Sequence, residues 1–168
     1  MGYAIKTGST QYRAVASESD IDLDEVFMSV LPVNPIWDES SQLLIEKTEA
    51  QLFQDYQLKK INELKIACKA TIEGGFTSDT LGTVHTYESA TPQDQINVLG
   101  AKESDKDRYF TCIDSNGVKD RRLHTKLQIK AIFDAGDAHI DTNMAKFYTL
   151  KAAVEAATTI AEVDAVVW

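Results

Sequence analysis

The amino-acid sequence predicts an α+β protein: an N-terminal β-hairpin, a long central helix, and a C-terminal helical domain that contains a small β-hairpin. Three observations carry this prediction. Two β-type runs flank a turn near the N-terminus, residues 38–72 contain neither proline nor glycine, and Asn116-Gly117 separates two further β-type runs. An Asn-Gly turn between such runs is a strong hairpin signal, and a long stretch without helix breakers favours a helix.

The first hairpin is predicted from residues 3–7 and 12–16, with Gly8-Ser9-Thr10 as its turn. Residues 17–25 form an acidic loop and residues 26–28 a short extended stretch. A lone two-stranded hairpin is only marginally stable in water, so this one needs a partner surface. Residues 1–33 are therefore assigned as an N-terminal docking segment.

The long helix is predicted within residues 36–73, after a linker at 31–36 that is marked by Pro32 and Pro35. Asp38 or Ser40 would cap its start, and Gly74-Gly75 would end it. One face carries apolar residues at helical spacing, namely Leu58, Ile61, Leu64, Cys68 and Ile72. The first half is less periodic, which indicates that part of the helix protrudes or pairs with another copy.

Residues 74–168 are predicted to form a compact α+β domain. Its first part is an irregular segment or short hairpin that turns at Leu81-Gly82, followed by a helix over residues 91–104. The strands of the Asn-Gly hairpin are expected at residues 109–113 and 118–123.

Two capping boxes predict the helices at the end of the chain. The first begins a helix at Thr125, which is expected to break or bend at Gly136, and the second begins a short helix at Thr159. One face of the longer helix is apolar and carries Ile140, Met144, Phe147, Leu150, Val154 and Ala157. Because an apolar end is unusual for a frayed tail, we expect Trp168 to pack.

Composition indicates an ordinary globular chain of one domain, or one domain with an appendage. Of 168 residues, 43% are apolar and 26% charged, and the formal net charge is −9. An acidic chain is repelled by nucleic acid and anionic lipid, so we expect neither as a partner. The absence of a leader pattern and of a long apolar run predicts no membrane insertion and a chain made in the cytoplasm. Cys68 and Cys112 are expected as reduced, half-buried thiols, although a disulfide between them stays open.

Sequence motifs for catalysis and cofactor binding are missing. The three histidines, His85, His124 and His139, have no neighbouring nucleophile pattern. Residues 20–24 have the alternating acids of a calcium loop, but the glycine and glutamate positions of that loop hold other residues. We therefore expect no enzyme, no catalytic residue, no cofactor and no metal.

A string of motifs in the C-terminal two thirds resembles a known domain. The string consists of Ile72-Glu73-Gly74-Gly75-Phe76-Thr77-Ser78, Gly82-Thr83-Val84-His85-Thr86-Tyr87, Asp94-Gln95-Ile96-Asn97, His124-Thr125-Lys126-Leu127-Gln128 and a terminal helix ending in Trp168. Over residues 57–168 it is similar to a domain of unknown function that recurs at the ends of bacteriophage tail-fibre and baseplate-associated proteins. The N-terminal Tyr3-Ala4-Ile5 and Tyr12-Arg13-Ala14-Val15 are similar to the openings of small phage tail-fibre and fibre-assembly proteins. The resemblance implies a role in the virion or its assembly.

Two groups of residues are candidate sites. The N-terminal segment offers a partner-binding patch or merely packs on its own helix; the patch would comprise Tyr3, Tyr12, Arg13, Val15 and Phe27. The motif string offers a hydrogen-bonded structural cluster or, alternatively, a receptor or glycan site. Its residues are His85, Tyr87, Asp94, Gln95, Asn97 and His124.

Three functional hypotheses follow from these features. The leading hypothesis is a structural component of a bacteriophage tail, located in the virion and bound to other fibre or baseplate proteins. The same hypothesis includes a homo-oligomer, for which a trimer would match tail symmetry. The alternative is a tail-fibre assembly chaperone. The third is a tip protein that binds or hydrolyses surface glycans, which would require paired carboxylates in a cleft.

Overall fold

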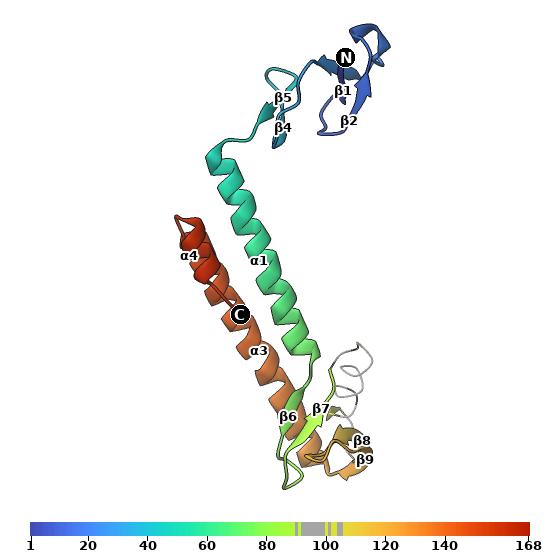
Figure 1. The fold of residues 1–168 in the computed structure, drawn as a ribbon. Coiled ribbons are helices and arrows are strands. Elements are labelled where there is room, and N and C mark those ends of the chain that lie inside the picture. Colours follow the sequence, from blue (N-terminus) through green and yellow to red (C-terminus); the bar gives the residue numbers. More distant parts are fainter. Residues whose placement is uncertain (90, 92–99, 101, 104–105) are drawn as a thin grey trace. The chain divides into compact units, whose positions relative to one another are not determined.

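The structure, a computed structural model, describes residues 1–89, 91, 100, 102–103 and 106–168. The chain divides into two compact units, residues 1–56 and 57–168, and each is described by itself. The predicted α+β class is confirmed: small antiparallel sheets combine with two long helices (Figure 1). The helix predicted over residues 91–104 falls almost entirely outside the described residues.

The first unit begins with a three-stranded antiparallel sheet. Strands β1 (Gly2–Lys6) and β2 (Tyr12–Val15) form the predicted hairpin, with Gly8 in its turn at φ 73°. A short 3-10 helix, η1 (Glu18–Asp20), leads to β3 (Glu25–Met28), the predicted extended stretch, which pairs with the other side of β1. The strand order β2-β1-β3 therefore makes β2 and β3 the edges of the sheet.

A second hairpin occupies residues that the sequence assigns to the linker and the start of the long helix. It consists of β4 (Pro35–Asp38) and β5 (Leu43–Glu46). The predicted helix start was wrong because cross-strand pairing of Trp37 with Leu44 outweighs local helix propensity. The carboxylate of Asp38 accepts hydrogen bonds from Ser40 and Ser41, so it stabilises the hairpin turn and caps no helix.

The long helix α1 (Glu49–Glu73) starts later than predicted, at a different cap. Thr48 Oγ1 accepts a hydrogen bond from Gln51 N at 3.2 Å, and Gln51 Oε1 accepts one from Thr48 N at 2.9 Å. This reciprocal pair is a capping box, which satisfies backbone donors that a helix start leaves open. The helix ends at Gly74 and Gly75 as predicted.

The second unit contains a four-stranded antiparallel sheet. The strands β6 (Phe76–Ser78), β7 (His85–Tyr87), β8 (Arg108–Ile113) and β9 (Lys119–His124) lie in sequence order. Both predicted hairpins, at Gly82 and at Asn116-Gly117, are present, and the pairing of β7 with β8 joins them into one sheet.

The sheet leads into α3 (Lys126–Ala156), capped by Thr125 as predicted. A break or bend was predicted at Gly136, and the break is wrong, because α3 continues through this residue as one helix. A Cβ atom on Gly136 would lie 3.0 Å from two ring atoms of Phe76, so glycine here makes room for packing rather than ending the helix. The short helix α4 (Ile160–Ala165) follows its predicted cap, Thr159.

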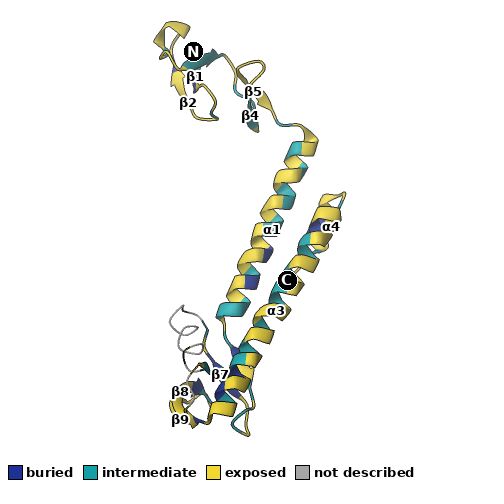
Figure 2. Ribbon diagram, turned by 180° about the vertical axis from the view of Figure 1, so that it is seen from behind, coloured by how far each residue is buried: buried dark blue, intermediate teal, exposed yellow. Residues whose placement is uncertain are grey.

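Helices α1 and α3 lie side by side and antiparallel within the second unit (Figures 1 and 2). Gln57 Nε2 donates to the backbone oxygen of Val154 at 2.8 Å, and Cys68 Sγ to that of Asn143 at 3.6 Å. Leu58 departs from the predicted inner face, because its side chain is 64% exposed and Gln57 takes the inner position. Trp168 packs as expected, with its indole N–H donating to Thr71 Oγ1 at 2.9 Å.

The core of the second unit lies where the sheet meets α3. Phe76, Tyr87, Cys112 and Ile132 form one buried cluster, and the buried positions in Figure 2 gather in the same region. Within the described residues, no helix has the length and apolar character needed to cross a membrane.

Candidate functional site

Two of the predicted polar residues, Tyr87 and His124, meet inside the second unit, and His85 is buried in the same sheet. His85 and His124 are 5% and 0% exposed, and Tyr87 is fully buried between strands β6 and β8. The hydroxyl of Tyr87 lies 3.0 Å from Nε2 of His124. Asp94, Gln95 and Asn97, which the sequence assigns to the same cluster, lie outside the described residues.

The hydrogen bonds of the two histidines show which ring nitrogen carries a proton. Nδ1 of His124 lies 2.8 Å from the backbone oxygen of Arg122, and Nδ1 of His85 lies 2.7 Å from that of Thr83. A carbonyl oxygen only accepts, so each Nδ1 must carry the proton. In neutral His124, Nε2 is then an acceptor, and the hydroxyl of Tyr87 donates to it.

Burial controls the charge state of this cluster. Desolvation lowers the pKa of His124 and raises the pKa of Tyr87, so both side chains stay neutral at neutral pH. The rings also touch, with centroids 5.9 Å apart at an interplanar angle of 67°. The uncharged Tyr87–His124 hydrogen bond therefore links β7 to β9, the strand that leads into α3. We call this residue pair the brace.

Sequence reasoning missed two members of the surroundings, Cys112 and the ion pair of Arg122 with Asp114. Nη1 of Arg122 donates to the backbone oxygen of Cys112 at 3.0 Å, and Nη2 to the carboxylate of Asp114 at 2.8 Å. Asp114 also accepts from the backbone N–H groups of Val118 and Asn116, which lowers its pKa. The sequence Asp114-Ser115-Asn116-Gly117 indicates an Asx-type turn, but it does not show that Arg122 binds the carboxylate of Asp114.

The described residues around Tyr87 and His124 present neither an accessible thiol nucleophile nor a set of metal ligands. Cys112 is 1% exposed, and both cysteines are free and more deeply buried than predicted. A nucleophilic thiol must be reachable and usually has a lowered pKa. In the part of the chain that the structure describes, no group of three His, Cys, Asp or Glu side chains is placed to hold a metal ion.

The pleat of the N-terminal sheet divides the predicted binding patch between two faces. In the register of β2-β1-β3, Arg13 and Phe27 lie opposite Ala4, whereas Tyr12 lies opposite Ile5. Opposed residues share a face, and neighbours along a strand do not. Tyr3 and Tyr12 thus share one face, with their rings in an edge contact at 5.7 Å. Val15, which is buried, lies on the other face with Arg13 and Phe27.

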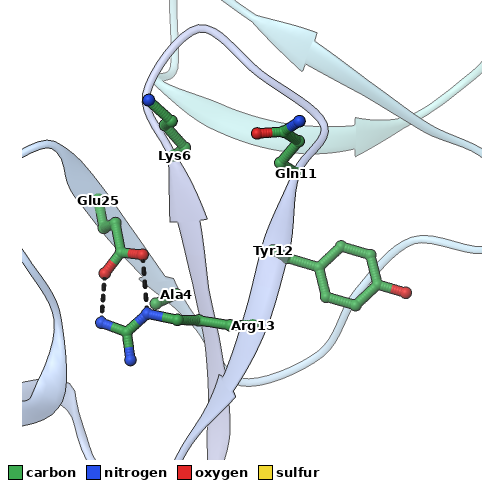
Figure 3. A pocket seen from close by; sticks show the side chains of 6 residues that line it. All are labelled: Ala4, Lys6, Gln11, Tyr12, Arg13 and Glu25. Carbon is green, nitrogen blue, oxygen red and sulfur yellow. Dashed lines mark hydrogen bonds and ion pairs between the residues drawn. The ribbon is translucent and has the colours of Figure 1, made fainter.

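The guanidinium group of Arg13 forms an ion pair within its own chain. Its Nε and Nη2 donate to the two carboxylate oxygens of Glu25 at 2.9 and 2.7 Å, which ties β2 to β3 across β1 (Figure 3). These hydrogen bonds lower the pKa of Glu25 and raise that of Arg13. The pair borders a shallow hollow of about 180 Å³, which Ala4, Lys6 and Tyr12 also line. The ring of Tyr12 points away from the Arg13–Glu25 pair (Figure 3) and is accessible on the other face of the sheet, where the residue is 56% exposed.

The brace predicts a large stability effect for a single hydroxyl group. Tyr87→Phe removes the donor to His124 Nε2 and leaves that buried atom unsatisfied, which costs about 1–3 kcal/mol. Urea unfolding measures the loss. Tyr109→Phe is the matched control, because Tyr109 lies in the same sheet at 60% exposure and should change stability by less than about 0.5 kcal/mol. Equal effects of the two changes would contradict the brace.

The lowered pKa of His124 predicts acid sensitivity in a defined window. The folded-state pKa lies below the ordinary value of 6.5, so the unfolded chain binds the proton more readily. The contribution of His124 is present above pH 6.5 and is lost as the pH falls from there towards the folded-state pKa. Urea unfolding from pH 8 to pH 5 should show this decline, and His124→Gln should flatten it. An equally steep decline in that variant would exclude His124 as its cause.

Comparison with known proteins identifies the second unit. No curated protein and no solved structure matches the chain. Residues 55–167 match one protein family, described as a domain of unknown function, DUF4376. The match covers α1 from residue 55 onward, the four-stranded sheet, α3 and α4, and so includes the Tyr87–His124 pair. The chain therefore belongs to the DUF4376 family.

Proposed function

We propose that this protein is a structural component of a bacteriophage tail, associated with the fibre or baseplate, and that it acts by binding other tail proteins without catalysis. One observation carries the proposal: the N-terminal unit buries few apolar side chains. Among residues 1–56, all of which the structure describes, the buried apolar side chains are Ala4, Ile5, Val15 and Leu44. Domains of this size are marginal even with well-filled cores.

Apolar side chains of the same unit remain in contact with water. Those that are large and exposed are Met1, Tyr12, Leu23, Val30, Val33, Leu43, Ile45 and Leu52. In addition, Nε1 of Trp37 is buried without a hydrogen-bond partner among the described residues. Such a donor costs about 1–3 kcal/mol. These features support a unit that gains its stability by docking on another protein.

The edge strands of this unit also indicate how it could dock on another protein. Edge strands such as β2 and β3 present backbone groups that can pair with a strand of another chain. Tyr12 projects from the edge strand β2 with 56% of its surface exposed, and tyrosine is frequent at binding hot spots. The edge of β2 around Tyr12 is therefore the proposed contact point.

The phage context of the proposal comes from the motif string and the N-terminal resemblance. The family itself carries no assigned activity. The Tyr87–His124 hydrogen bond and the backbone partners of His85 Nδ1 and His124 Nδ1 support a structural use of those motif residues rather than a receptor or glycan site. The net charge of −9 favours basic protein surfaces as partners.

Mass spectrometry of purified phage particles, with copy numbers, tests the proposal. We expect the chain in finished particles, in a fixed ratio to the fibre or baseplate proteins. Its absence from particles, combined with copurification with the fibre from infected cells, would contradict a virion role and indicate an assembly chaperone.

The same measurement on a variant phage tests the docking surface. Tyr12→Asp should lower the copy number in particles at least tenfold, because it places a charge where an aromatic side chain is to be buried. Tyr109→Asp is the control, since Tyr109 is equally exposed but lies in the second unit. Unchanged incorporation of Tyr12→Asp would show that docking occurs elsewhere.

A further inference from the structure

The turn between β8 and β9 places an asparagine before a glycine at an exposed position. Asn116 and Gly117 lie between the two strands, and both residues are exposed. Gly117 has φ 78°, in the left-handed region that favours glycine. Because glycine has no Cβ atom, its backbone nitrogen can approach the preceding side chain with little steric hindrance. Asn116 is the one asparagine in the sequence that precedes a glycine.

An asparagine in this position can lose ammonia without an enzyme. The backbone nitrogen of Gly117 attacks Cγ of Asn116, and its proton passes through water to the side-chain nitrogen. The new N–Cγ bond closes a succinimide ring as the old Cγ–N bond breaks and ammonia leaves. Water then adds to either carbonyl carbon of the ring and breaks the bond from that carbon to nitrogen. The products are an aspartate, or an isoaspartate in which the main chain runs through the side-chain carbons.

Hydrogen bonds of the folded turn oppose this attack. The backbone N–H of Gly117 donates to the backbone oxygen of Asp114 at 2.9 Å, so this bond must break before the nitrogen can lose its proton. The N–H groups of Asn116 and Val118 donate to Oδ1 of Asp114 at 2.9 and 3.0 Å. These bonds hold the backbone on both sides of the reacting atoms. The reaction therefore requires local opening of the turn.

The carboxylate that holds the turn is itself held by β9. Oδ2 of Asp114 accepts from Nη2 of Arg122 at 2.8 Å, and the two side chains are only 23% and 25% exposed. Nη1 of Arg122 also donates to the backbone oxygen of Cys112, so the guanidinium group is fixed from two sides. Hydrogen bonds to ionised groups are stronger than those between neutral groups. Asp114 is thus the side chain on which closure of the turn depends most.

The other described asparagines lack the requirements for this reaction. Asn34 precedes Pro35, which has no backbone N–H to lose. Asn62 lies inside α1 and Asn143 inside α3, where the next backbone N–H is bonded along the helix. The residue after each of these two also carries a side chain, which hinders the approach of its nitrogen. Among the described asparagines, Asn116 alone combines exposure, a turn and a following glycine.

We propose that Asn116 is a site of spontaneous deamidation, and that the Asp114 carboxylate, held by Arg122, controls how fast it reacts. The modification consumes only water and releases ammonia. It adds a carboxylate close to Asp114, and the isoaspartate form lengthens the main chain in the turn that aligns β8 with β9. Because β9 carries His124, modified chains should be less stable in the sheet that contains the brace. The proposal is independent of the role in a phage tail.

Peptide mass spectrometry of the full-length protein after incubation at pH 8 tests the site. Samples are kept folded in buffer or unfolded in guanidinium chloride, so the ratio of the two rates cancels the intrinsic reactivity of the sequence. Folded wild-type protein should deamidate at Asn116 about tenfold or more slowly than the unfolded chain, because the turn must open first. Asn116→Gln should abolish the reaction here, since the longer side chain closes a ring much less readily. No modification at Asn116 in either state would overturn the site.

Substitution of Asp114 tests the control of the rate. Asp114→Ala should accelerate the reaction in the folded protein by about tenfold or more, because the turn loses its side-chain acceptor. Asp120→Ala is the matched control: it removes a carboxylate from the same hairpin, but one that accepts from the N–H of Arg121. Circular dichroism verifies folding, and if Asp114→Ala unfolds, Asp114→Ser provides the same comparison with a smaller acceptor. Equal rates in folded and unfolded wild-type protein, or in the Asp114 and Asp120 variants, would overturn the proposed control.

Discussion

The contact of Phe76 with α3 and Tyr87 determines the arrangement of the second unit. Gly75, at φ 90°, lets the chain turn from α1 into β6, and a Cβ atom there would lie 2.5 Å from the backbone oxygen of Tyr87. The ring of Phe76 then stacks on Tyr87 at 5.6 Å and fills the space that Gly136 leaves on α3. Because Tyr87 in turn holds His124, next to the cap of α3, one continuous set of contacts fixes where both helices meet the sheet.

The two units differ in how completely their buried polar atoms are hydrogen-bonded and their apolar side chains are buried. In the second unit, buried polar atoms of the brace have partners, and a contiguous apolar cluster joins the sheet to α3. In the first unit, an Arg13–Glu25 pair links exposed strands, few apolar residues are buried, and the indole N–H of Trp37 lacks a partner among the described residues. The physical contrast supports a stable end domain and a unit that depends on what it binds.

The sequence predicts elements well where local chemistry decides them. Capping boxes placed the starts of α3 and α4, and glycine turns placed the hairpins. It fails where tertiary contacts outweigh local preference: Trp37 and Leu44 pair in a hairpin within a glycine-free stretch, and Gly136 receives a ring from β6. For the candidate sites, the motif string indicated that His85, Tyr87 and His124 belong together. The role of Arg122 and the division of the N-terminal patch depend on strand register, which one-dimensional patterns do not contain.

We infer that the N-terminal unit is completed by a partner protein, whereas the DUF4376 unit is stable by itself. Hydrogen–deuterium exchange of the isolated full-length chain decides between this inference and two equally stable units, because amide protection reports local opening free energy. Strands of similar length allow a fair comparison. The account predicts fast exchange in β1, β2 and β4 and slow exchange in β8 and β9. Equal, strong protection of both sets of strands in the isolated chain would contradict it.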